Sequence, residues 1–226
     1  MKGLKKTLMF ATAAMVLGIW SSSAFGMATL SIDDGVNPAI LTVDTDNDGF
    51  VSFNCNPMNP CTLSGWTANV TTGFTKPLIG SAGFPDMDLN SVETSSSGGG
   101  SLVIKWSDTD FNGLLPDPGF TMASGWTTQG TVQVQAYLGK DNALFSTDVL
   151  LADTGTQSGP GFFSMINGGA TNVMGPYSLT MVTTITHQGS GTSSGDTQLH
   201  AVPEPGTMML MGSGLLGLGL WRKFKK

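Results

Sequence analysis

The chain has 226 residues, with 16 acidic and 10 basic side chains and a formal net charge of −6 at pH 7. Seven of the basic side chains lie within the first six and the last five residues, so residues 27–201 keep three lysines against 15 acids, a net charge of −12. Such a surface repels phosphate backbones, which excludes nucleic acid as a partner and favours cations or neutral and basic glycans. This segment is long enough for one domain with its own core.

The first residues have the pattern of an export signal. Three lysines within the first six residues precede the apolar stretch Leu8–Trp20, and small residues follow, with Ala24 and Gly26 at the −3 and −1 positions of a cut. This order predicts a helical signal peptide over residues 1–26, which signal peptidase removes. A cut after Ala28 is an alternative.

Residues 27–187 are expected to form an antiparallel β-sandwich with jelly-roll-like winding. Thr, Val, Phe and Ile recur in short runs interrupted by Gly and Ser, without a long apolar period of about 3.6 residues. In Thr131–Tyr137 the even positions are apolar and the others mostly polar, which is typical of a half-buried strand. Strands at this spacing favour an all-β sandwich. The predicted strands are 39–44, 49–54, 67–73, 88–94, 101–107, 131–137, 143–150 and 177–187, and 95–100 and 153–169 are expected to be loops.

One turn between predicted strands has the ligands of a calcium site. Asp44, Asp46 and Asp48 place carboxylates at alternate positions before Gly49, as in the first half of a calcium-binding loop. The twelfth position, where a carboxylate closes such a loop, is Cys55. Weak Ca²⁺ binding is therefore one interpretation, and a hairpin turn that uses Asp, Asn and Gly for their backbone geometry is the other. No other cofactor is predicted.

The two cysteines, Cys55 and Cys61, are separated by five residues. Export carries them to an oxidising compartment, where two cysteines without further partners are expected to form a disulfide. A metal site of this spacing needs two more ligands, and the two histidines, His187 and His200, are far away in the sequence.

No catalytic residues are predicted, and the chain is expected not to be an enzyme. The sequence lacks a nucleophile elbow, a phosphate-binding loop and a metalloprotease motif. Its carboxylates leave a glycosidase pair open, but they gather in Asp-x-Asp segments, 86–88 and 108–110, that are expected to be solvated turns. Trp66, Trp106 and Trp126 are candidates for glycan stacking or for core packing.

The C-terminal part begins with residues 188–201, which are small and polar and predict a flexible linker. Val202-Pro203-Glu204-Pro205 follows, then an apolar run over 207–221 and a cationic end. Fifteen helical residues span about 22 Å, which is short for a hydrocarbon core of about 30 Å, and the cations stay on the cytoplasmic side. The tail therefore predicts a transmembrane helix that holds the protein in the membrane only briefly.

These three parts, in this order over residues 202–226, closely resemble the PEP-CTERM sorting signal of Gram-negative bacteria. The resemblance implies that an exosortase, an integral-membrane cysteine protease, processes the tail at or near the Pro-Glu-Pro motif. It also implies export across the inner membrane, transient membrane anchoring through 207–221, and a surface or extracellular protein with a structural or adhesive role in an exopolysaccharide biofilm matrix. An ordinary membrane anchor with a chance Pro-Glu-Pro sequence is the alternative.

Two other functions stay open. A carbohydrate-binding or carbohydrate-active secreted module would use the abundant carboxylates and tryptophans. The tail is also catalogued as the C-terminal domain of ice-binding proteins, but among the predicted strands only 177–187, at Thr184-Ile185-Thr186, has the threonine spacing that ice binding needs. Residues 69–77, 87–91 and 107–111 resemble segments of uncharacterised PEP-CTERM proteins, and this resemblance implies no chemistry.

Overall fold

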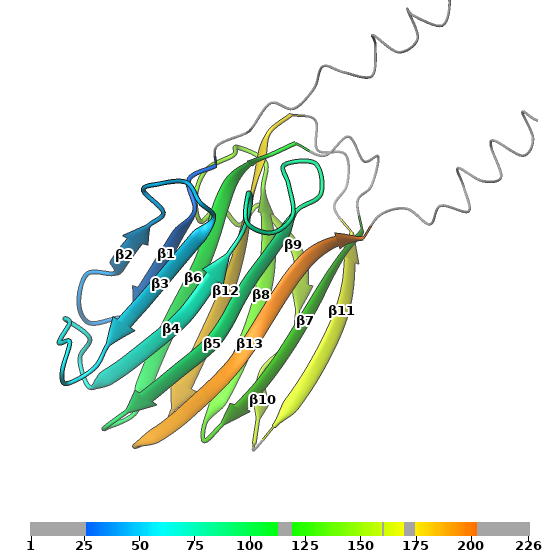
Figure 1. Ribbon diagram of the computed structural model, residues 1–226. Helices are drawn as coiled ribbons and strands as arrows, with labels where there is room; N and C mark the ends of the chain where they lie inside the picture. The colour runs from blue at the N-terminus through cyan, green and yellow to red at the C-terminus, as the bar shows by residue number, and fades with distance from the viewer. Residues whose placement is uncertain (1–25, 113–118, 160, 170–174, 203–226) are drawn as a thin grey trace, which may run out of the picture.

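The computed structural model describes residues 26–112, 119–159, 161–169 and 175–202. In these ranges the regular structure consists of 13 β-strands, which form two antiparallel sheets (Figure 1). The predicted terminal helices, including the apolar run 207–221, fall outside the described residues. Among the residues that are described, no helix is long and apolar enough to cross a membrane.

Each sheet combines strands from both halves of the chain. Sheet A has the order β10 (Gln157–Ser158), β8 (Thr131–Gly139), β12 (Tyr177–His187), β6 (Gly100–Phe111), β1 (Thr29–Asp33) and β2 (Ile40–Val43), and β9 (Val149–Asp153) also pairs with β8. Sheet B has the order β11 (Phe162–Gly169), β7 (Gly119–Thr128), β13 (Gly191–Val202), β5 (Asp86–Ser96), β4 (Trp66–Phe74) and β3 (Phe50–Cys55). Consecutive strands such as β5 and β6, or β12 and β13, lie in opposite sheets, so the chain crosses between the two sheets at these points.

The two sheets pack face to face around one apolar core, with sheet B in front of sheet A in Figure 1. Alternate residues of β6 supply the core, because Leu102, Ile104 and Trp106 are fully buried. The Trp106 ring of sheet A lies against Gly73 of sheet B, where the missing side chain leaves room for the indole. Each large apolar side chain buried in this way contributes roughly 1.5–3 kcal/mol.

The prediction of a flexible linker over 188–201 is wrong, because most of this segment forms a central strand, β13. Strand β13 pairs with β7 on one side and β5 on the other, and it extends to Val202. The segment is polar because hydroxyls face the interior and bond there: Ser193 Oγ lies 2.7 Å from Thr128 Oγ1, and Thr197 Oγ1 lies 2.8 Å from Ser124 Oγ. The folded body therefore extends beyond residue 187, to Val202.

Most other predicted strands agree with the structure within a few residues. The exception is 143–150, of which only the last two residues belong to a strand, β9. Strands β1, β7, β10 and β11 were not predicted, and the last two lie within the expected loop 153–169. In β7 the alternation of apolar and polar residues is hard to recognise in the sequence, because several residues of the strand are small. Trp126 fills the space beside it: its ring lies against Gly195 of β13, where any Cβ would overlap the indole.

Candidate functional site: a polar groove on sheet B

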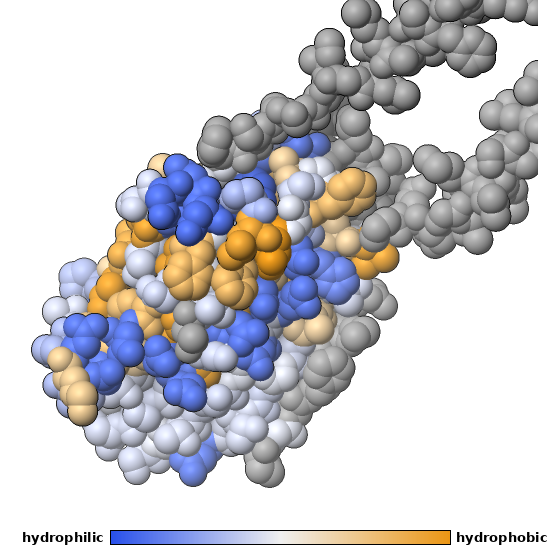
Figure 2. Space-filling view, in the orientation of Figure 1, coloured by the Kyte–Doolittle hydropathy of each residue, from blue (hydrophilic) through white to orange (hydrophobic). Residues whose placement is uncertain are grey.

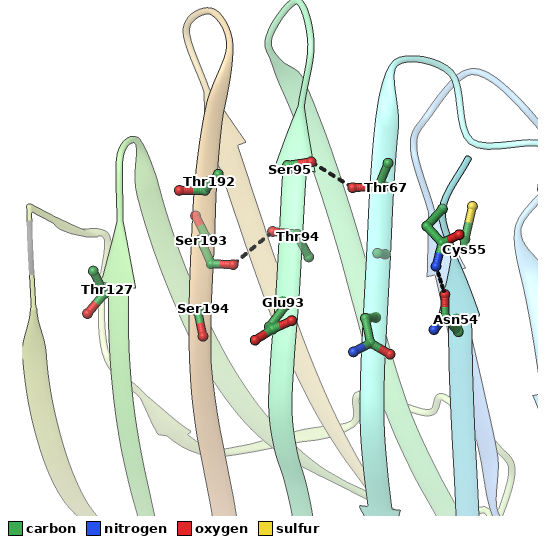
Figure 3. A pocket seen from close by; sticks show the side chains of 13 residues that line it. Asn54, Cys55, Thr67, Glu93, Thr94, Ser95, Thr127, Thr192, Ser193 and Ser194 are labelled. Atoms are coloured by element: carbon green, nitrogen blue, oxygen red, sulfur yellow. Dashed lines mark hydrogen bonds between the residues drawn. The ribbon is translucent and has the colours of Figure 1, made fainter. Parts of the chain in front are cut away.

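A shallow groove of about 500 Å³ lies on the outer face of sheet B (Figure 3). It is near the end of the sandwich where the turns 97–99 and 188–190 connect strands of opposite sheets. In Figure 2 the part of this face farthest from the grey tails has mostly pale and blue, hydrophilic colours. The groove is lined by Asn54, Cys55, Asn56, Thr67, Ala68, Asn69, Glu93, Thr94, Ser95, Thr127, Thr192, Ser193 and Ser194.

Five lining residues, one from each of five neighbouring strands, lie in register across the sheet. Asn54 is opposite Asn69, and Asn69 is opposite Glu93. Glu93 is opposite Ser194, which is in turn opposite Thr127. Adjacent strands lie about 4.8 Å apart, so this line of side chains extends over about 19 Å. These five residues are called the polar row below.

Strand alternation presents the row to solvent. In β5 Val92 is fully buried whereas Glu93 is exposed, because successive side chains point to opposite faces of a sheet. A second line runs parallel to the first, since Thr67 and Thr192 are both opposite Ser95. The Thr67 and Ser95 hydroxyls are 2.6 Å apart (Figure 3). The groove floor therefore offers hydroxyl, amide and carboxylate groups in two aligned rows.

The two central strands of sheet B are acidic. Strands β5 and β13 carry four carboxylates, Asp86, Asp88, Glu93 and Asp196, and neither strand has a lysine or an arginine. Burial raises the pKa of Asp88, and the neighbouring charges of Asp196 and Asp86 raise it further, although a hydrogen bond from Asn90 opposes them. A ligand of this face must therefore be neutral or positively charged.

The structure confirms the predicted disulfide at the edge of the groove. Cys55 and Cys61 are bonded, with their Cα atoms 5.5 Å apart. The closed loop is tightened by two backbone hydrogen bonds of 3.0 Å between Asn56 and Asn59. Because Cys55 and Asn56 line the groove, the disulfide fixes its β3 side.

The three aspartates of the predicted calcium turn lie together, outside the groove. One carboxylate oxygen of each of Asp44, Asp46 and Asp48 lies within 4.8 Å of the others. Asp44 is buried and accepts hydrogen bonds from the Gly49 N–H at 2.9 Å and the Asp48 N–H at 3.3 Å. Cys55 is held in its disulfide and cannot close the site. Calcium binding at this turn stays a prediction.

The three candidate tryptophans are core residues. Trp66, Trp106 and Trp126 are 5%, 0% and 2% exposed, so their rings are not available to stack on a glycan. His187 is also buried, between the sheets, where its ring stacks on Trp66 at 5.0 Å between centroids. His200 lies in β13, not in a linker.

The two Asp-x-Asp segments lie in strands, so the prediction that they are solvated turns is wrong. Residues 86–88 open β5, and 108–110 lie near the end of β6. Asp108 is fully buried and its Oδ2 lies 2.8 Å from Lys76 Nζ, at the centre of a polar cluster. Burial raises the pKa of Asp108, and the Lys76 ammonium opposes this rise. This pair is structural and lies away from the groove lining.

The groove supplies several hydrogen-bonding groups and one carboxylate, that of Glu93, among its lining residues. Hydroxyls and amides both donate and accept hydrogen bonds, so the two rows match a ligand rich in hydroxyl groups. Asn69, Glu93 and Ser194 are not among the site residues that the sequence predicts. The sequence does show that alternate positions of β4 and β5 are polar and therefore face solvent. It does not show which of these positions lie opposite one another on neighbouring strands.

Comparison with solved structures gives weak likenesses. The enzymatically active domain of bacteriophage CBA120 tailspike protein 4 is 14% identical, with a TM-score of 0.34, and the match covers 62% of this chain and 20% of that one. TmCBM61, in complex with β-1,4-galactotriose, is 10% identical, with a TM-score of 0.28 and coverage of 60% and 88%. The C-terminal CBM6 of LamC, a marine laminarinase from Zobellia galactanivorans, is 10% identical, with a TM-score of 0.25 and coverage of 76% and 98%. Likenesses at this level assign no function, and no curated protein matches the sequence.

The C-terminal sequence gives a specific match. The PEP-CTERM protein-sorting motif matches residues 201–223, beginning within β13. This motif implies that an exosortase processes the protein, and that the protein is exported to the cell surface or the extracellular space. The chain therefore carries a PEP-CTERM protein-sorting motif over residues 201–223.

Proposed function

We propose that this protein is a non-enzymatic adhesive component of an extracellular polysaccharide matrix, and that the polar row contacts the polysaccharide. The observation that carries the proposal is the alignment of five polar side chains across β3, β4, β5, β13 and β7. Export to the cell surface or the extracellular space supports the proposal, because polysaccharides of a matrix lie outside the cell.

The chemistry of the row supports a glycan ligand. Sugar hydroxyls need partners that both donate and accept hydrogen bonds, which the Asn, Ser and Thr side chains do. A line of about 19 Å suits an extended polymer more than a compact metabolite. The acidic character of β5 and β13 favours a neutral or amino-sugar polymer over an acidic one.

The same lining argues for binding without hydrolysis. Glycoside hydrolysis generally uses two carboxyl groups about 5–10 Å apart, whereas Glu93 is the one carboxylate among the residues that line the groove. A carbohydrate-active enzyme is therefore the less favoured function.

Affinity electrophoresis of the exported protein tests the proposal. Its migration is compared in gels containing a neutral glucan, a partly deacetylated chitin or alginate. Glu93→Ala with Ser194→Ala changes two exposed groups at the centre of the row. Thr184→Ala with Thr186→Ala, on strand β12 of sheet A, is the control for the other sheet. Each migration is expressed relative to a gel without polymer, because Glu93→Ala also removes a charge.

We expect the neutral or amino-sugar polymer to retard the migration of the parent protein. Losing two hydrogen-bonding groups of about 1 kcal/mol each should weaken binding about tenfold or more. The control pair should bind as the parent does. Equal retardation of all three proteins, or retardation by none of the polymers, would overturn the assignment of this face.

A further inference from the structure

The beginning of the described chain lies in a polar cluster at the opposite end of the sandwich from the groove. The backbone N–H of Met27 donates to Thr109 Oγ1 at 3.1 Å. Ala28 is 1% exposed, and its carbonyl accepts a hydrogen bond of 2.9 Å from Asp44 N–H. The residues just before β1 are therefore held in place by Thr109 and by the core.

The charges of this cluster do not balance. Lys76 Nζ donates to Asp108 Oδ2 at 2.8 Å and to the Thr109 carbonyl at 2.5 Å. The next carboxylate, Asp110, receives hydrogen bonds from Asn142 Nδ2 and the Thr109 hydroxyl, at 2.7 and 3.4 Å. Lys76–Asp108 is the one salt bridge in the part of the chain that the structure describes. The cluster thus has two carboxylates and one ammonium, and that ammonium pairs with Asp108.

We propose that this cluster is the docking site for the new N-terminus, and that signal peptidase cuts between Gly26 and Met27. Water hydrolyses the Gly26–Met27 peptide bond, leaving a carboxylate on Gly26 and an ammonium on Met27. That ammonium keeps the hydrogen bond to Thr109 and supplies the missing positive charge beside Asp108 and Asp110. Removal of the signal peptide thereby completes the charge balance of the folded body.

The geometry distinguishes the two candidate cuts. A cut after Ala28 removes a buried residue and the carbonyl that binds Asp44 N–H. A cut after Gly26 removes neither. Gly26 also lies in a crowded position, because a Cβ there would overlap Lys76 Nζ, Asp108 Oδ1 and the Thr109 carbonyl. The uncut chain can therefore pass over the ion pair only with a glycine at this position.

The experiment uses protein exported and processed by the native host. N-terminal sequencing locates the cut, and ¹³C NMR of the reductively methylated α-amine measures its pKa. A second protein carries Gly-Ser-Gly inserted between Gly26 and Met27, which moves the ammonium three residues away. Each is also made with Asp110→Asn, and with Glu93→Gln as a control that changes the same charge on the outer face of sheet B.

We expect a mature chain that starts at Met27, with the pKa of its α-amine above the ordinary range of about 7.7–8.0. The insertion should lower the melting temperature of the parent and of Glu93→Gln by the same amount. It should lower that of Asp110→Asn by less, because the carboxylate partner is gone. A different first residue, or an ordinary α-amine pKa in the parent, would overturn the proposal. The NMR result decides the matter even where Asp110→Asn does not fold.

Discussion

His187 should make the protein less stable as the pH falls below about 6.5. The imidazole is 2% exposed, and both ring nitrogens have hydroxyl partners: Nδ1 lies 2.7 Å from Ser96 Oγ and Nε2 lies 2.8 Å from Ser193 Oγ. Burial lowers the pKa of His187. The residue is therefore neutral in the folded protein at neutral pH.

The surrounding hydrogen bonds explain why a second proton is unfavourable. Ser96 donates to the Gly189 carbonyl at 3.0 Å, so its oxygen accepts from Nδ1–H of His187. Nε2 then accepts from Ser193, which is also paired with Thr128 at 2.7 Å. Protonated Nε2 can no longer accept, so the Ser193 hydroxyl must turn toward Thr128. One buried hydroxyl proton is then left without an acceptor.

The sign and size of the effect follow from proton linkage. Below the unfolded pKa of about 6.5 the unfolded chain binds a proton at His187 that the folded chain does not. Stability is therefore fully present above about pH 6.5 and is lost as the pH falls toward the lowered folded pKa. Between about pH 7.5 and 5.5 the loss reaches up to about 1.4 kcal/mol.

Urea unfolding at several pH values, followed by fluorescence and near-ultraviolet circular dichroism, measures this loss in the parent and in His187→Gln. The difference between the two curves is needed because the raised pKa values of Asp88 and Asp108 act in the opposite direction. His187→Gln should be less stable at pH 7.5 but lose less stability toward pH 5.5. Parallel pH curves for the two proteins would refute the reasoning.

Three further changes test other parts of the structure. Replacing Cys55 and Cys61 with serine should cost about 2 kcal/mol of unfolding free energy, because the closed loop is short, and alkylation of the native protein should require a reductant. Millimolar Ca²⁺ should raise the melting temperature modestly, and Asp46→Asn with Asp48→Asn should abolish most of that rise. An unchanged calcium response in the double variant means that the turn is not the site. Lys76→Met should lower stability by about 3–5 kcal/mol in denaturant titrations, because it leaves a buried carboxylate without its ammonium, and a loss below 1 kcal/mol would contradict this.

Strand alternation made much of the fold predictable, and buried hydroxyls account for the main error. Thr131–Tyr137 alternates apolar and polar residues, so the sequence identifies β8. Strand β13 has the same alternation of buried and exposed positions, but its inward positions include Ser193 and Thr197 rather than only apolar residues. Their hydrogen bonds form with β7, which is more than 60 residues earlier in the chain. Local composition therefore indicates a linker where long-range pairing forms a central strand.

The candidate site was less predictable than the fold because it depends on register. Asn69, Glu93 and Ser194 are unremarkable in sequence and become neighbours only through the pairing of β4, β5 and β13. The tryptophans are the opposite case, because they stand out in the sequence but do not line the site. Trp66 and Trp126 are obvious candidates for glycan contact, yet both have the inward phase of their strands and are buried.

Intact-mass analysis of the native surface protein tests the central claim, that this is an exported body whose two terminal signals are removed. A mass that corresponds to a chain from Met27 to a residue at or near the Pro-Glu-Pro motif agrees with the account. Such a chain retains all of β13, whose last residue is Val202. An extracellular form that still carries the cationic end, residues 222–226, would contradict exosortase processing and leave a plain membrane anchor.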